Sequence, residues 1–90
     1  MGKATKSKRE IRATVKTYIL KEVLPGEDPD ELDDTTPLIT GGILDSISTM
    51  KLVASLEERF GIEFQAHEIS IDYLDTLSKI ARIVTSKLSE

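Results

Sequence analysis

Apolar residues recur every four positions near the start of the chain, a spacing typical of a helix that packs one face against a core. They are Ile11, Val15, Ile19 and Val23. The pair Pro25-Gly26 interrupts this pattern, because proline lacks a backbone donor and glycine favours turns. The spacing therefore predicts a first helix that begins near Ser7 and ends before Pro25.

The segment that follows is acidic and rich in turn-forming residues up to about Leu44. This composition predicts a long loop, in which Leu32, Leu38 and Ile39 are the apolar residues that anchor the chain to the core. Loops of this length are uncommon and are often functional.

A second helix is predicted to begin after Asp45 and to end at Gly61. Aspartate is a favoured N-cap residue. Glycine followed by an apolar residue, here Ile62, is typical of a helix that ends in the left-handed conformation.

In the C-terminal third of the chain, the apolar spacing predicts one more long helix, capped by Asp75 or Thr76. A short helix is predicted before it, at 65–70. The apolar face of the long helix comprises Leu77, Ile80, Ala81, Val84 and Leu88. No segment alternates strictly between apolar and polar residues, so no strand is expected. The predicted fold class is all-α, a small four-helix bundle with three long helices, one short helix and a long loop between the first two.

The second helix carries two separate apolar sectors when its residues are placed at about 100° intervals. One sector contains Leu52, Val53, Leu56 and Phe60 and predicts the core face, whereas the other contains Ile47, Met50 and Ala54. With the first sector packed inward, the second becomes an exposed docking surface flanked by Glu57 and Glu58. The alternative is that Ile47 and Met50 pack under the long loop.

Length and composition limit the kinds of chemistry available to the chain. Ninety residues suffice for one domain. We expect a basic flexible leader over residues 1–6 and a helical domain over residues 7–90. The chain has no Cys and a single His, which excludes thiol nucleophiles, disulfides and cysteine-based zinc sites and suits the cytoplasm.

Charge is distributed unevenly around the net value of −4. The first twelve residues carry +4, whereas residues 22–76 contain fourteen acids and two bases, Lys51 and Arg59. This acidic surface repels nucleic acid and favours basic protein partners. The sequence shows neither the apolar core of a signal peptide nor a membrane span, and we expect a monomer.

Ser46 follows the predicted cap, in the first turn of the second helix. Unpaired N–H groups and the positive end of the helix dipole favour an anion there, such as a phosphate ester. A capping role alone would also explain a serine or an aspartate at these positions.

The residues around Ser46 resemble those of the acyl carrier proteins. The resemblance rests on the motif Gly42-Ile43-Leu44-Asp45-Ser46-Ile47, the segment from Leu56 to Glu63 and the later Leu74-Asp75-Thr76-Leu77. It implies that Ser46 carries 4′-phosphopantetheine through a phosphodiester and that the thiol of this arm holds an acyl or aminoacyl group as a thioester. The cofactor then supplies the sulfur that the chain lacks.

The resemblance also implies partners, and no catalytic residue. Asp45 would belong to the motif recognised by a phosphopantetheinyl transferase. Loading ligases, acyltransferases and synthases would dock through basic surfaces onto Ile47, Met50, Ala54, Glu57 and Glu58. Gly-Ile-Leu-Asp-Ser-Ile is most similar to discrete single-domain carriers, including those loaded with D-alanine or another amino acid. Fatty-acid, polyketide and aminoacyl cargoes all remain open, and Lys51 stands where an acid is common in the family.

Three other readings compete with a carrier. A hydrolase would pair Ser46 with His67, but Gly-x-Ser-x-Gly is absent. A calcium loop starting at Asp28 would need a glycine at its sixth position and a glutamate at its twelfth, where the sequence has Asp33 and Ile39. We therefore expect no metal site. A non-catalytic helical adaptor would use the same exposed face of the second helix without any covalent cofactor.

Overall fold

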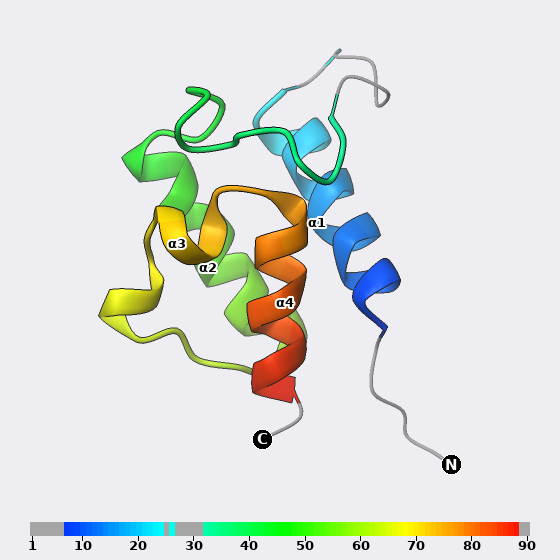
Figure 1. Ribbon diagram of the computed structural model, residues 1–90, viewed down its shortest axis with the longest axis vertical. Coiled ribbons are helices and arrows are strands. Elements are labelled where there is room, and N and C mark those ends of the chain that lie inside the picture. The colour runs from blue at the N-terminus through cyan, green and yellow to red at the C-terminus, as the bar shows by residue number, and fades with distance from the viewer. Residues whose placement is uncertain (1–6, 25, 27–31, 89–90) are drawn as a thin grey trace.

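The chain folds into a helical bundle, shown by a computed structural model that describes residues 7–24, 26 and 32–88 (Figure 1). The α-helices are α1 (Lys8–Glu22), α2 (Ser46–Phe60), α3 (Ile71–Leu74) and α4 (Leu77–Leu88), and a 3₁₀ helix spans Ala66–Glu68. No strand occurs within these ranges. The all-α prediction of three long helices and one short helix is confirmed. The predicted leader, residues 1–6, lies outside the described part.

Helix α1 begins and ends where the pattern predicts. The Ser7 hydroxyl accepts a hydrogen bond from the Glu10 N–H at 3.2 Å, and the Glu10 carboxylate accepts one from the Ser7 N–H at 3.2 Å. This reciprocal capping box satisfies two backbone donors at the helix start. Ile11, Val15 and Ile19 are buried, and α1 packs alongside α4 (Figure 1).

The long loop between α1 and α2 is anchored by the predicted side chains. Leu32 and Leu38 are buried and Ile39 is partly buried against the core. The Leu44 N–H donates to the Leu38 carbonyl oxygen at 2.7 Å, closing the last part of the loop before α2. The loop therefore delivers the chain to the start of α2 in a defined position.

Helix α2 has the predicted ends and, with one exception, the predicted core face. Asp45 is its N-cap, and Gly61 follows with φ of +65°, the left-handed conformation that glycine adopts without strain. Leu52, Val53 and Leu56 are buried. Phe60 was predicted with them but is only partly buried, because it is the last residue of α2 and lies at the margin of the core.

The short helix predicted at 65–70 is wrong in extent. Only Ala66–Glu68 is helical there, as one 3₁₀ turn, and α3 begins after the predicted segment. Four-residue α3 buries only Leu74, so it leaves no periodic apolar pattern in the sequence. Thr76, rather than Asp75, caps α4, since its hydroxyl accepts from the Lys79 N–H at 3.1 Å.

Each helix in the described ranges is too short or too polar to cross a lipid bilayer.

Candidate functional site

Ser46 is the first residue of α2 and is exposed. The preceding Asp45 fixes this turn in two ways. Its carboxylate accepts a hydrogen bond from the Ser48 N–H at 2.7 Å, and its carbonyl oxygen accepts one from the Thr49 hydroxyl at 2.7 Å. The structure thus presents the Ser46 hydroxyl on a hydrogen-bonded first turn, where the helix dipole favours an attached anion.

Asp45 is held in its ionised form by the same turn. The hydrogen bond from the Ser48 backbone N–H lowers the pKa of the Asp45 carboxyl below its usual range, since such a bond favours the charged form. A fixed negative charge therefore stands directly beside Ser46 at neutral pH. This placement agrees with the recognition role expected for Asp45, which stays a prediction.

Asp75 anchors the loop that leads to α2, a role that the sequence analysis missed. Its carboxylate accepts hydrogen bonds from the Ile39 N–H at 2.8 Å, the Thr40 N–H at 2.9 Å and the Thr40 hydroxyl at 2.9 Å. Its carbonyl oxygen accepts one from the Leu38 N–H at 2.6 Å. One aspartate between α3 and α4 thereby holds the turn that precedes Ser46.

Burial raises the pKa of the Asp75 carboxyl, but the hydrogen bonds from Thr40 and Ile39 outweigh this effect, and the net pKa lies below its usual range. A lowered pKa in the folded state means that the ionised group stabilises the fold above the unfolded-state pKa of about 3.9. This contribution is lost as the pH falls through the lower, folded-state pKa.

We expect Asp75→Ala to lower the free energy of unfolding by about 1–3 kcal/mol near neutral pH, because it removes the charged acceptor of the three hydrogen bonds from Ile39 and Thr40. Urea melts at several pH values measure the effect. The gap between wild type and variant should narrow below about pH 4. Asp72→Ala, at an exposed position of α3, is the matched control, and an equal loss in that variant would contradict the anchoring role.

A groove of about 480 Å³ runs beside Ser46, between the start of α2 and the segment around α3. Most of its lining is apolar. The residues around it are Ile39, Leu44, Asp45, Ser46, Thr49, Met50, Ile69, Ser70 and Ile71. Clefts of this size, mostly apolar with a few placed polar groups, are typical of small-molecule sites. No pattern in the sequence indicates that the segment 69–71 approaches Ser46.

The second apolar sector of α2 is exposed, as predicted. Ile47 is 68% exposed and Met50 52% exposed, and Ala54 is exposed as well. Neither Ile47 nor Met50 packs under the loop as a buried residue. Two further exposed apolar residues, Ile71 and Tyr73, belong to α3, and they were not predicted.

The two flanking acids of this sector differ in their surroundings. Glu58 is exposed. Glu57 is partly buried and accepts a hydrogen bond from the Phe64 N–H at 2.9 Å. Glu57 therefore also holds the segment that follows α2, which a purely partner-facing residue would not do.

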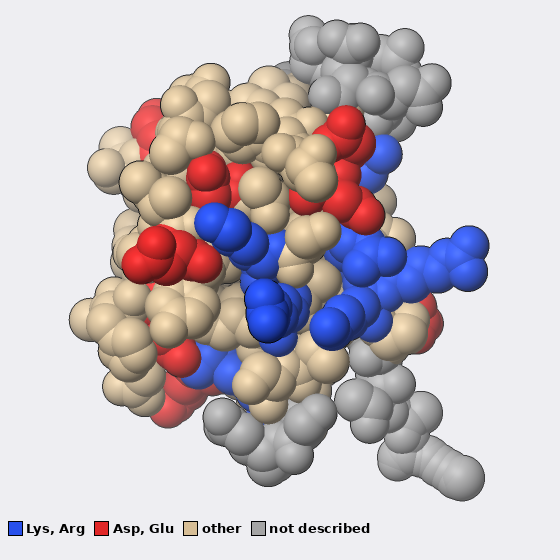
Figure 2. All heavy atoms as spheres, viewed as in Figure 1, with Lys and Arg blue, Asp and Glu red and all other residues tan. Residues whose placement is uncertain are grey.

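Charges are separated over the surface. Figure 2 shows Lys and Arg gathered over α1 and α4. These two helices contain eight of the twelve Lys and Arg residues but only two acids, Glu10 and Glu22. A positively charged surface would therefore be attracted toward the other, acidic parts of the chain rather than toward the α1–α4 face.

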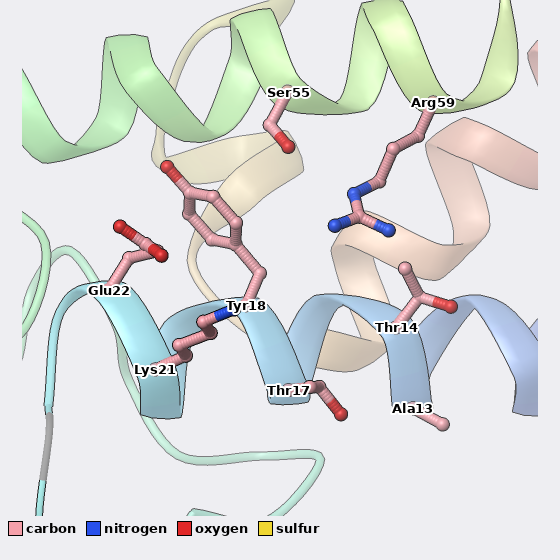
Figure 3. Close-up of a pocket in the computed structure, with 8 residues that line it drawn as sticks. All are labelled: Ala13, Thr14, Thr17, Tyr18, Lys21, Glu22, Ser55 and Arg59. Carbon is pink, nitrogen blue, oxygen red and sulfur yellow. The ribbon is translucent and has the colours of Figure 1, made fainter.

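A second pocket lies between α1 and α2, away from Ser46. It measures about 400 Å³. Figure 3 shows Tyr18 of α1 and Arg59 of α2 pointing into the space between the two helices. Its lining includes neither Ser46 nor Asp45, so it is not part of the candidate site.

The residues considered for a hydrolase or a metal site do not come together in the structure. His67 is exposed and its ring meets that of Tyr73 edge-on, with centroids 6.3 Å apart. Within the described residues, no hydrogen bond joins His67 to Ser46, and no group of three His, Asp or Glu side chains is arranged to hold a metal ion. Asp28, where the compared calcium loop would start, lies outside that part of the chain.

Comparison with known proteins identifies a family model and several similar proteins. Residues 17–84 match the family model described as "Phosphopantetheine attachment site". The D-alanyl carrier protein of Streptococcus sanguinis is 34% identical over 76 residues, which cover 84% of this chain and 92% of that protein. That of Leuconostoc citreum is 32% identical over 68 residues, covering 76% of this chain and 85% of that protein.

Proposed function

We propose that the chain carries an aminoacyl group, specifically a D-alanyl group, on a phosphopantetheine arm attached to Ser46. The chain belongs to the family of phosphopantetheine-attachment carrier proteins. The family assignment makes the chain a carrier with covalent 4′-phosphopantetheine, not an enzyme. The identity of the modified serine and of the cargo is the proposal.

The exposed hydroxyl of Ser46 on the first turn of α2 carries the proposal. The residues present fit the cofactor, because Ser46 offers an accessible oxygen for the phosphodiester and a groove begins beside it. The dipole of α2 favours the phosphate charge. When bound, the cofactor supplies the thiol that forms the thioester. Two aspartates position the attachment point, Ser46. Asp45 holds the first turn of α2, and Asp75 holds the loop that precedes α2.

An aminoacyl cargo is supported by the relatives, which are named D-alanyl carrier proteins. They give no corresponding support to the fatty-acid and polyketide cargoes that the sequence left open.

Partner enzymes are expected at the exposed face of α2. The coarse partner classes follow from the family: a phosphopantetheinyl transferase and enzymes that load or unload the carrier. We propose that they contact Ile47, Met50, Ala54, Glu57 and Glu58. Basic docking surfaces on these enzymes would be steered by the acidic parts of the chain, mainly through the association rate.

Two successive mass measurements test the proposal. Incubating the chain with coenzyme A and a phosphopantetheinyl transferase should add one phosphopantetheinyl group. Adding ATP, D-alanine and a D-alanine-activating carrier ligase should then add one alanyl group, which neutral hydroxylamine removes as expected of a thioester. Absence of the first gain would contradict the carrier assignment, and would favour the adaptor alternative.

The aminoacylation step tests the identity of the cargo independently of the attachment of the arm. L-alanine with the same ligase, and a fatty acyl or malonyl donor with the matching acyltransferase, are the controls. Loading by a fatty acyl donor but not by D-alanine would overturn the aminoacyl proposal while leaving the carrier function intact.

A further inference from the structure

Positively charged side chains of α1 and α4 form a surface of their own. Four of them fall within an arc of about 100° on α1 when its residues are placed at about 100° intervals. Two more are three residues apart on α4, and so lie on the same side of that helix. Figure 2 shows Lys and Arg of both helices gathered on one face of the molecule. The basic face comprises Lys8, Arg9, Arg12, Lys16, Lys79 and Arg82.

The basic face is largely without counter-charges. Arg12 forms an ion pair with Asp34, with 3.1 Å between the Arg12 Nε and a carboxylate oxygen. The other five cations form no ion pair within the described residues. The Glu10 carboxylate is engaged in the capping box with Ser7. An uncompensated group of like charges produces a positive potential that attracts an anionic partner.

The basic face also lacks large exposed apolar side chains. In the part of the chain that the structure describes, those side chains are Ile47, Met50, Ile71 and Tyr73, all of α2 and α3. Binding energy at protein–protein interfaces is concentrated in buried anchors, among which Trp, Tyr and Arg are frequent. The basic face therefore differs from the exposed sector of α2, and it fits a partner that is bound through charge alone.

Nucleic acids and anionic lipid surfaces are two partners of that kind. Proteins that hold single-stranded nucleic acid usually stack its bases on aromatic side chains. Tyr18, the aromatic residue of α1, is partly buried against the core, and α4 has no aromatic residue. The basic face thus lacks a stacking surface, which favours a lipid surface over nucleic acid.

Shape and screening favour a lipid surface as well. A flexible polyanion can reach around the chain to its acidic parts, whereas a flat surface meets only the side that faces it. Screening limits charge interactions to about 10 Å at 0.1 M ionic strength. The molecule measures 20 Å along its shortest axis. Acids on the far side of the molecule therefore repel a flat anionic surface only weakly.

We propose that the basic face binds the surface of a bilayer rich in anionic lipids. The contact is peripheral, because α1 and α4 expose no large apolar side chain that could insert into the bilayer. Each cation close to an anionic leaflet strengthens binding about fivefold. The inference concerns α1 and α4 alone, so it does not depend on the attachment proposed at Ser46.

Sedimentation with lipid vesicles tests the proposal. Vesicles of phosphatidylglycerol and phosphatidylcholine in equal parts should bind the wild-type chain at about 0.1 M NaCl, whereas vesicles of phosphatidylcholine alone should not. Binding should fall steeply as the NaCl concentration rises. The double variant Lys16→Gln, Arg82→Gln should bind the anionic vesicles about 25-fold more weakly, given about fivefold for each cation removed.

The matched control is the double variant Lys51→Gln, Arg59→Gln. It removes the same net charge from exposed positions of α2, outside the basic face. It should bind the anionic vesicles as wild type does. Circular dichroism of both double variants checks that the helices are retained, and the salt dependence of wild-type binding needs no variant.

Four results would overturn the proposal. The wild-type chain could fail to bind the anionic vesicles, or could bind phosphatidylcholine vesicles equally well. Equal losses in the two double variants would mean that net charge, rather than the basic face, determines binding. Tighter binding of single-stranded RNA than of the anionic vesicles would assign the basic face to nucleic acid instead.

Discussion

Ser46→Ala should remain at its unmodified mass after incubation with coenzyme A and a phosphopantetheinyl transferase, whereas wild type gains one phosphopantetheinyl group. The reason is covalent: alanine lacks the oxygen that forms the phosphodiester. We expect complete loss of loading rather than a slower rate. Because Ser46 is exposed in the first turn of α2, the substitution should change the free energy of unfolding by no more than about 0.5 kcal/mol.

Ser48 provides the control for this experiment. It lies two residues along the same turn, and Ser48→Ala keeps the backbone N–H that donates to the Asp45 carboxylate. Ser48→Ala should load fully. Circular dichroism of both variants should match wild type. A phosphopantetheinyl group on Ser46→Ala protein would show that another residue is the attachment site.

Leu56→Ala should lower the free energy of unfolding by about 2–5 kcal/mol, the range for large-to-small changes in a packed core. Leu56 is 1% exposed and belongs to the hydrophobic core cluster formed by the helices and the loop. A domain of this size has a total stability of only about 5–15 kcal/mol. The variant should therefore lose much of its resistance to urea, as measured by the shift of the unfolding midpoint.

Ile47→Ala is the matched comparison on the opposite side of the same helix. Its side chain is 68% exposed, so the change in the free energy of unfolding should stay within about 0.5 kcal/mol. Its effect should appear instead in loading kinetics, as a raised KM for the transferase or ligase if Ile47 contacts these partners. A larger stability loss in Ile47→Ala than in Leu56→Ala would contradict the orientation of α2.

The long helices could be predicted from the sequence because their causes are local. A buried stripe repeats with the period of the helix itself, as in Ile11, Val15 and Ile19 of α1. Capping groups act within about four residues, which places Ser7 and Asp45 at helix starts and Gly61 at a helix end. The position of Ser46 in the first turn of α2 indicates only that an anion is favoured there. Its predicted role as the attachment site came from the resemblance to the acyl carrier proteins.

The short elements were not predictable in this way. One helical turn buries too few side chains to produce a period, so the helix at 65–70 is predicted too long and α3 is not predicted. Phe60 has the correct phase for the core, but its exposure depends on where the neighbouring helices end. These errors have a common cause. The hydrophobic pattern predicts which face of a helix a side chain lies on, but it does not predict which other element packs against that face.

The sequence by itself therefore determined the helices, the exposed sector of α2 and the serine at its start, because each depends on bonds or periods within a few residues. Only the tertiary structure decided which groups surround that serine. Asp75 reaches Ile39 and Thr40 across 36 and 35 residues of chain, and Ser70 meets the same groove as Ser46 from a separate segment. Contacts of this kind arise when the helices pack together, and no local pattern in the sequence records them.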